Sequence, residues 1–308
     1  MSASMAPFRI GTRGSPLALT QAHMVRNALA AAHRLDPDAF EIVVIRTTGD
    51  KVQDRPLAEI GGKALWTKEL DRALLAGEID CAVHSMKDVE TIRPVMIAIV
   101  AMLPRADVQD RIVGAESVAA LRQGAVIGTS SPRRAAQMRR LRPDLQIVMF
   151  RGNVDTRLAR LSAGEADATL LAAAGLERLG RHDIGHAIPT NVMLPAPAQG
   201  AIGVEVRADD PKAIEMLAAI DHPETHRCIL AERALLAALK ADCHSPVAAL
   251  AVIEGAILTL TAELFTEDGT EHVHGQIEGA PLDSQIPAAL ARDLLTRAPT
   301  AVRRLFEG

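Results

Sequence analysis

The sequence predicts an α/β protein whose last third is a smaller α+β region. From residue 8 to about 206, short apolar runs typical of strands alternate with segments that have the apolar period of a helix. After residue 221 this alternation stops, and one long helical segment is followed by apolar runs separated by turns. A chain of 308 residues with 48% apolar composition is long enough for two or three domains of about 100–200 residues each.

In the first region the pattern predicts strands over 8–11, 41–47, 80–84, 95–101, 125–128, 145–150 and 167–171. Helices are expected between them, over 17–32, 67–76 and 153–163. Strands that alternate with helices favour a mostly parallel sheet covered by helices. In the last third, the pattern predicts a helix over 223–239, strands over 247–253, 256–264 and 271–277, and a closing helix over 284–295.

The basic residues are unevenly distributed. Net charge is −4, yet 28 of the 34 basic residues are arginine, and eight of these lie between residues 133 and 160 beside only two acids. Arginine binds carboxylate and phosphate groups in a planar, two-pronged geometry, so an anionic ligand is expected. An acidic protein without tyrosine and with one tryptophan is not expected to bind nucleic acid by base stacking.

Cellular location can also be predicted from composition. The run 95–103 is the longest apolar one in the N-terminal half, far below the roughly 18 residues of a membrane span, and no signal peptide is recognised. Three scattered cysteines favour a reducing cytoplasm over a disulfide framework. No tight cysteine–histidine cluster completes a metal site. We therefore expect a cytoplasmic protein without membrane partner or metal.

Several polar motifs follow predicted strands. The segment 84–88 (His-Ser-Met-Lys-Asp) directly follows one, where ligands bind in open α/β sheets, although a solvated turn explains it equally well. Ser15-Pro16 and Ser131-Pro132 are helix caps, and helix N-termini flanked by arginine also attract anions. Taken together, these helix starts favour binding of an anion over capping alone.

In sequence these motifs closely resemble the porphobilinogen deaminase family. The matching residues run in order over about four-fifths of the chain, in segments 9–19, 61–63, 68–70, 84–88, 128–134, 151–158, 173–176, 194–203, 231–233 and 242–247. The resemblance implies two lobes like those of periplasmic binding proteins, with central β-sheets, and a small C-terminal α+β domain. It places domain 1 at residues 1–103 and 198–220, domain 2 at 104–197, and domain 3 at 221–308.

The resemblance also implies an activity. Members of the family are transferases that join four porphobilinogen molecules head to tail, with loss of ammonia, and release the linear hydroxymethylbilane by hydrolysis. The chain grows on a dipyrromethane cofactor, one per protein chain, bound covalently through a cysteine that matches Cys243. Asp88 matches the catalytic carboxylate, and a monomer is expected. The alternative is a non-catalytic bilobal protein that binds or senses an anion.

Further roles are carried over by position. Cofactor binding is implied for Lys63, Ser85, Lys87, Asp88, Thr129, Ser131, Arg133 and Arg134, and substrate binding for Arg13, Ser15, Arg151, Arg157, Arg178 and Gln199. We expect the other arginines of the basic segment to lie on a solvated helix face: Arg139, Arg140, Arg142 and Arg160.

Three positions depart from the family pattern. Glu59 stands where many members have a basic residue, Glu90 where proline is common, and Gln109 where an arginine is usual. We expect the turn after Asp88 to be less rigid as a result of Glu90. The polar stretch 48–62 is long enough to be either an active-site lid or a disordered loop, and we favour a lid over the cleft.

Overall fold

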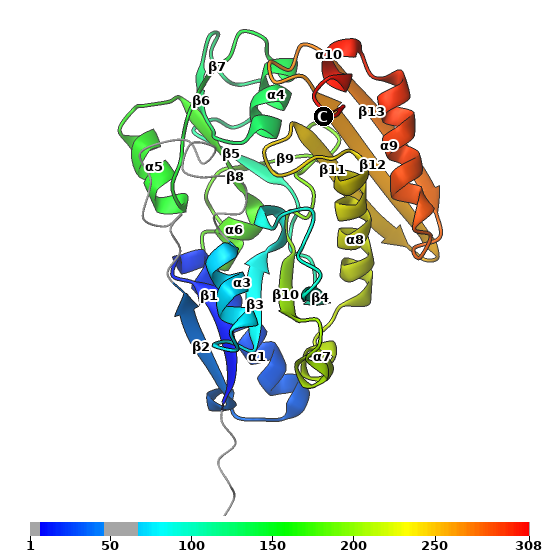
Figure 1. Cartoon of the computed structure of the whole chain (residues 1–308). Helices are drawn as coiled ribbons and strands as arrows, with labels where there is room; N and C mark the ends of the chain where they lie inside the picture. Colours follow the sequence, from blue (N-terminus) through cyan, green and yellow to red (C-terminus); the bar gives the residue numbers. More distant parts are fainter. Residues whose placement is uncertain (1–6, 46–66, 308) are drawn as a thin grey trace, which may run out of the picture. The chain divides into compact units, whose positions relative to one another are not determined.

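The computed structural model describes residues 7–45 and 67–307, which belong to two compact units. The first unit combines the chain up to residue 105 with residues 201–226, and the second combines residues 106–200 and 227–308. Each contains a five-stranded sheet with helices, and the second also contains a three-stranded sheet (Figure 1). The predicted fold class, two α/β lobes with a small C-terminal α+β part, is confirmed.

The sheet of the first unit has the strand order β2-β1-β3-β10-β4. Its strands are β1 (Phe8–Arg13), β2 (Phe40–Ile45), β3 (Cys81–Ser85), β4 (Ile97–Met102) and β10 (Ile202–Arg207). The helices of this unit are α1 (Pro16–His33), α3 (Lys68–Leu75) and α7 (Pro211–Ala218), with short 3-10 turns at η1 (Pro37–Ala39) and η3 (Met86–Asp88). Its main core joins buried side chains of α1, α7 and the sheet, among them Ile10, Leu29 and Val204.

The five-stranded sheet of the second unit has the order β7-β6-β8-β5-β9. Its strands are β5 (Asp110–Val113), β6 (Val126–Gly128), β7 (Gln146–Val148), β8 (Ala168–Ala172) and β9 (His186–Ile188). Helices α4 (Pro132–Leu141), α5 (Val154–Ser162) and α6 (Ala173–Arg178) follow strand ends. Gly128 ends β6 against the ring of Phe150, which a Cβ at this position would approach to 2.4 Å.

Both five-stranded sheets are mixed, so the prediction of mostly parallel strands is wrong for half of the pairings. β1 pairs with β2 and β3 in parallel, and β6 does so with β7 and β8. β10 runs antiparallel to both β3 and β4, and β5 runs antiparallel to both β8 and β9. The antiparallel strands β5, β9 and β10 are the ones that the sequence pattern did not single out.

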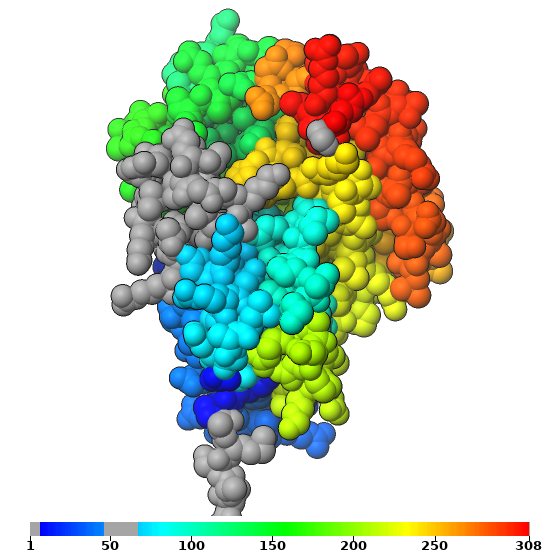
Figure 2. All heavy atoms as spheres, viewed as in Figure 1, coloured from blue at the N-terminus to red at the C-terminus, as the bar shows by residue number. Residues whose placement is uncertain are grey.

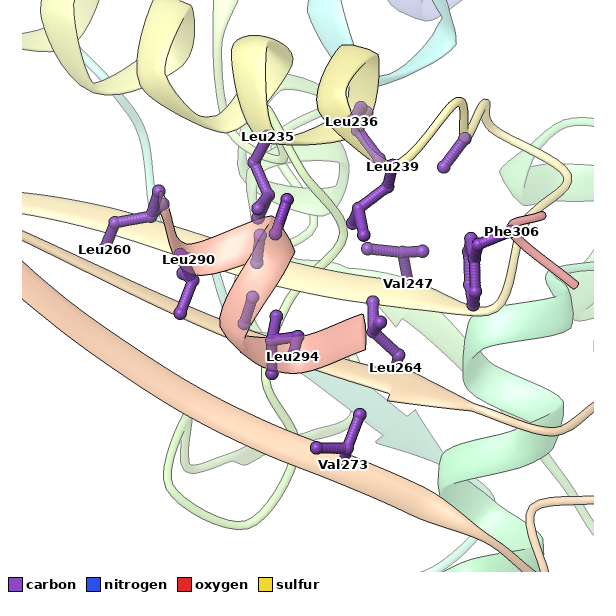
Figure 3. Packing of buried hydrophobic residues seen from close by; sticks show 14 of the residues in the cluster. Leu235, Leu236, Leu239, Val247, Leu260, Leu264, Val273, Leu290, Leu294 and Phe306 are labelled. Atoms are coloured by element: carbon purple, nitrogen blue, oxygen red, sulfur yellow. The ribbon is translucent and has the colours of Figure 1, made fainter. Parts of the chain in front are cut away.

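The C-terminal sheet is an antiparallel meander of β11 (Val247–Glu254), β12 (Ile257–Phe265) and β13 (His272–Gly279). One face packs against α8 (Pro223–Ala238), α9 (Gln285–Arg297) and α10 (Thr300–Arg303). In this core, Leu290 of α9 lies beside Leu260 of β12 and Leu294 of α9 beside Leu264, while Leu239, directly after α8, lies beside Val247 (Figure 3). In the space-filling view α9, in red, and β13, in orange, form a continuous surface (Figure 2).

The opposite face of the C-terminal sheet packs on α4. Phe265 and Ala248 are buried together with Ala136 of α4 and Leu194. Arg140 of the same helix forms an ion pair of 2.8 Å with Glu263, and Arg139 donates to the carbonyl of residue 267. The prediction of a solvated face is therefore wrong for these two arginines, which tie α4 to the sheet.

Glu232 in the middle of α8 links two further segments of the second unit. Its fully buried carboxylate accepts hydrogen bonds from the backbone N–H groups of Ala198, at 2.5 Å, and Ala251, at 2.7 Å. Ala198 has a φ of +62°, unusual for a residue with a Cβ. The carboxylate therefore holds residues 195–200 against α8 in a conformation that this segment would otherwise rarely adopt.

The helices in the described part of the chain are all too short or too polar to cross a membrane.

Candidate active site

In the first unit, five of the predicted site residues lie at one edge of the sheet. β1 and β3 are parallel neighbours, so Arg13 at the end of β1 and Ser85 at the end of β3 lie at the same edge. Ser15 follows β1 and caps α1 by accepting a hydrogen bond from the N–H of Ala18 at 3.3 Å. Lys87 and Asp88 follow β3 in η3, where Asp88 is exposed. Gln21 of α1 donates to the Ser85 hydroxyl at 2.7 Å and so fixes the start of this turn.

A buried charged cluster lies behind the same turn. Glu205 of β10 is fully buried, and its carboxylate contacts Nε2 of His84 at 3.1 Å and Nε of Arg93 at 2.8 Å. Arg93 also contacts Asp71 and Glu90 at 2.5 and 2.6 Å. Burial acts to raise the pKa of Glu205, but His84 and Arg93 outweigh it and lower that pKa to about 2. The sequence analysis did not predict this cluster. The signal for it in the sequence is an acid, Glu205, within the apolar run of β10.

In the second unit, Arg133 and Arg134 lie at the start of α4, behind the cap formed by Ser131. Both guanidinium groups are buried and face Asp110, whose side chain is fully buried at the start of β5. Arg133 Nη1 lies 2.8 Å from Oδ2 of Asp110, and Arg134 Nη2 lies 2.6 Å from Oδ1. Gln199 joins the cluster, with Nε2 at 3.0 Å from the same Oδ1. Asp110 was not among the predicted site residues.

The electrostatic balance of this cluster leaves one excess positive charge. Burial acts to raise the pKa of Asp110, but the charges and hydrogen bonds of Arg133 and Arg134 hold it well below its usual range. Burial in turn lowers the pKa of Arg133. The charge of Asp110 acts to raise this pKa, and the charge of Arg134 acts to lower it further. The buried Nε of Arg133 has no hydrogen-bond partner among the described residues. One carboxylate thus balances two buried cations.

Arg178, at the end of α6, is a predicted binding residue with little charge compensation among the described residues. Its Nη2 donates to the carbonyl of Gly200 at 2.6 Å, and its buried Nε has no hydrogen-bond partner within the described residues. Burial lowers the pKa of Arg178 to about 10, with only Glu177 acting to raise it. A partly buried cation held by a neutral carbonyl is well suited to binding an anionic group.

Three further predicted residues lie in or beside the starts of α4 and α5. Thr129 is buried, and its hydroxyl accepts a hydrogen bond from the N–H of Ser131 at 3.2 Å. Arg157 of α5 donates to the carbonyl of Gly152 at 3.1 Å, which holds its side chain over the loop. Arg151 is part-exposed in that same loop.

Cys243 lies on the tight turn between α8 and β11. The side chain of Asp242 accepts from the N–H of His244 at 2.9 Å, and the hydroxyl of Ser245 accepts from the N–H of Asp242 at 3.0 Å. The turn leaves the thiol of Cys243 exposed, whereas Cys81 and Cys228 are buried. Cys243 is thus the cysteine that a covalent ligand can reach.

Two of the sequence predictions lie outside the described residues. These are Lys63 and the lid over 48–62, which includes Glu59. The third departure, Gln109, donates its backbone N–H to the side chain of Asp107 at 2.8 Å. In the ranges 7–45 and 67–307, no three His, Cys, Asp or Glu side chains are grouped as a metal site would require.

Comparison with known proteins gives two family matches. The family model for the porphobilinogen deaminase dipyrromethane cofactor binding domain matches residues 8–215, and that for the C-terminal domain matches residues 226–296. A porphobilinogen deaminase of Sphingopyxis alaskensis is 61% identical over 97% of this chain and 96% of its own length. One of Paracoccus denitrificans is 52% identical over 95% of each chain. A solved periplasmic binding protein of Salmonella typhimurium matches 72% of this chain and 97% of its own, at 12% identity and a TM-score of 0.40.

Proposed function

The chain belongs to the porphobilinogen deaminase family, and we propose from the geometry of its two units which residues perform the hydroxymethylbilane synthase reaction. The protein is a transferase with a dipyrromethane cofactor, and a non-catalytic anion-binding role is not favoured. The observation that carries the proposal for catalysis is the position of Asp88. It is an exposed carboxylate at the sheet edge that also holds Arg13 and Ser15.

Each addition breaks the bond between the aminomethyl carbon of porphobilinogen and its nitrogen, and forms a carbon–carbon bond to the terminal pyrrole. The amine leaves as ammonia, and the proton lost from the attacking pyrrole carbon balances the one that the amine takes up. Asp88 is suited to hold that proton and to accept hydrogen bonds from pyrrole N–H groups. Its negative charge also stabilises the positive charge that develops as the amine leaves.

The residues present fit the dipyrromethane cofactor. Cys243 offers an exposed thiol for a thioether bond, and the two arginines at Asp110 provide excess positive charge for the carboxylates of the pyrrole rings. When bound, the cofactor supplies the pyrrole ring to which the first substrate is joined. We assign cofactor binding to Lys63, Ser85, Lys87, Asp88, Thr129, Ser131, Arg133 and Arg134.

Substrate carboxylates are assigned to a second set of residues. The support is strongest for Arg178, because it is largely buried and, among the described residues, its printed hydrogen bond goes to a neutral carbonyl, which favours binding of an anion. Arg13, Ser15, Arg151 and Arg157 are assigned from their places in strand-end loops and helix starts. The amide nitrogen of Gln199 bonds to Asp110 and to the carbonyl of Val108, so we assign Gln199 a role in fixing the arginine cluster.

The cofactor assignment is tested by intact mass. The purified protein should carry a dipyrromethane adduct that is absent from Cys243→Ser and retained in Cys228→Ala, which changes a buried cysteine of the same unit. An adduct that persists in Cys243→Ser would refute the attachment site.

The catalytic assignment is tested by turnover. Asp88→Asn should remain folded and lose most of its activity, because the amide cannot hold the proton. Near-normal turnover of Asp88→Asn would refute the role of this carboxylate.

We also propose three domains, with boundaries at residues 1–103 and 198–220, 104–197, and 221–308. The separate core of the C-terminal sheet supports the third of these. A monomer in the cytoplasm is proposed because one chain supplies every candidate site residue and its three cysteines form no disulfide with one another.

A further inference from the structure

We propose that Glu205 and Arg93 act as positioning residues that fix the turn carrying Asp88, an inference that rests on the catalytic role proposed for Asp88. Together with His84 and Glu90 they form what we call the Glu205 clamp. These four residues belong to the first unit, and their contacts surround the turn in sequence.

The clamp holds the start of the turn through His84. This residue is the penultimate one of β3, four positions before Asp88, and it is 5% exposed. Its Nε2 lies 3.1 Å from Oε2 of Glu205 on the neighbouring strand β10. Because β3 and β10 are also joined by backbone pairing, this contact adds a side-chain link between the two strands just before the chain turns.

The clamp holds the end of the turn through Glu90 and Arg93. Glu90 lies two positions after Asp88, and its carboxylate contacts Arg93 Nη1 at 2.6 Å. Arg93 in turn donates through Nε and Nη2 to the two oxygens of Glu205, both at 2.8 Å. The same carboxylate of Glu205 thus holds both the residue before the turn and the loop after it.

Thr67, directly before α3, and Asp71 within that helix fix the clamp from the outside. The hydroxyl of Thr67 lies 2.7 and 2.8 Å from the oxygens of Glu90, and Asp71 of α3 contacts Arg93 Nη2 at 2.5 Å. Arg93 therefore uses all three guanidinium nitrogens on three different carboxylates. A lysine, with one nitrogen, cannot make these contacts at the same time.

The ion contacts of the clamp fix a defined geometry, which stabilisation of the fold alone does not require. Buried ion clusters are often no more stabilising than apolar side chains of the same volume, because removing the charges from water is costly. They do fix a geometry, since each donor must point at its acceptor.

The test compares Arg93→Lys with Arg9→Lys. Arg9 forms a two-pronged pair with Asp80 at the opposite end of β3, at 2.7 and 3.1 Å, and has no assigned role in the site. In the cofactor-loaded enzyme, Arg93→Lys should lower kcat about 10-fold to 100-fold, the loss expected when a catalytic group moves by about 1 Å. KM should stay within about 2-fold, because the binding arginines are untouched. Arg9→Lys should leave both constants near those of the wild type.

Glu90→Gln provides a second variant in case Arg93→Lys fails to fold. It keeps the hydrogen bond of Thr67 but weakens the contact with Arg93, so kcat should fall in the same direction. A kcat for a folded Arg93→Lys or Glu90→Gln that matches that of Arg9→Lys would overturn the inference. Asp88→Asn is measured in parallel. If Asp88→Asn keeps near-normal turnover, the proposed catalytic role of Asp88 fails. If Asp88→Asn loses its turnover while the clamp variants keep theirs, the catalytic role stands and only the positioning role of the clamp is refuted.

A double substitution separates positioning from general stability. In the Asp88→Glu background the carboxylate is already displaced by one methylene group. Adding Glu90→Gln should then lower kcat by a smaller factor than it does in the wild type, because both changes act on the same position. Equal factors in the two backgrounds would show that the clamp acts independently of Asp88 and would overturn the inference.

Discussion

Replacing Asp110 by asparagine should destabilise the second unit strongly. The substitution keeps the shape of the side chain but removes the one carboxylate that balances the buried guanidinium groups of Arg133 and Arg134, at 2.8 and 2.6 Å. Breaking a buried ion pair by neutralising one partner costs about 3–5 kcal/mol, because the other charge remains out of water. The cost should lie at the upper end, since two cations lose their partner at once.

The loss can be measured locally by native-state hydrogen exchange at increasing urea concentration, with peptides covering β5 and α4. Asp144→Asn serves as the control, because Asp144 pairs with Arg142 at the exposed surface and solvent screens that contact. A loss below about 1 kcal/mol for Asp110→Asn would refute the idea that Asp110 is the counter-ion of this cluster.

The pH dependence of the same variant has a definite sign. The pKa of Asp110 is lower in the folded protein than its unfolded value of about 3.9, so its contribution is complete above that value and declines as the pH falls from it towards the lower folded pKa. The advantage of the wild type over Asp110→Asn should therefore be constant between about pH 7 and 5, and should shrink below about pH 4.

Three further predictions follow from single contacts. Glu232→Gln should lower the free energy of unfolding by about 1.5–3 kcal/mol, because the amide has one acceptor oxygen where the carboxylate offers two to the N–H groups of Ala198 and Ala251. An unchanged midpoint of urea denaturation would contradict this. Gly128→Ala should cost about 1–3 kcal/mol through its clash with the ring of Phe150, and thermal unfolding will measure it; an unaltered Tm would show that the ring can move aside. Arg178→Met should raise KM for porphobilinogen about 10-fold with a smaller change in kcat, and a KM equal to that of the wild type would remove Arg178 from the binding set.

The sequence predicted best those strands whose apolar runs lie between helices. Runs such as 80–84 and 167–171 correspond to β3 and β8, which are the buried central strands of their sheets. β10 was missed because Glu205 interrupts its apolar run, and β5 because it starts with Asp110 and Arg111. In both strands the polar residue is balanced by partners distant in sequence, which a local pattern does not reveal.

The site shows the same division. Motif resemblance supplied the residues that we expect to contact ligands, including Asp88, Arg178 and Cys243, and these roles stay predictions. It did not reveal Asp110 or Glu205, whose carboxylates pair with side chains distant in sequence. We expected a less rigid turn after Asp88 because of Glu90, whereas in the structure Glu90 is held by Thr67 and Arg93.

The place of β10 in its sheet has a consequence for synthesis on the ribosome. β4 pairs with β10 and with no other described strand, yet about 100 residues of the second unit separate the two in sequence. At about 5–20 residues per second, β4 emerges about 5–20 s before its partner exists. During that time its apolar side chains and its unpaired backbone are open to other chains. The nascent protein should therefore need a chaperone most between the emergence of residue 102 and that of residue 207.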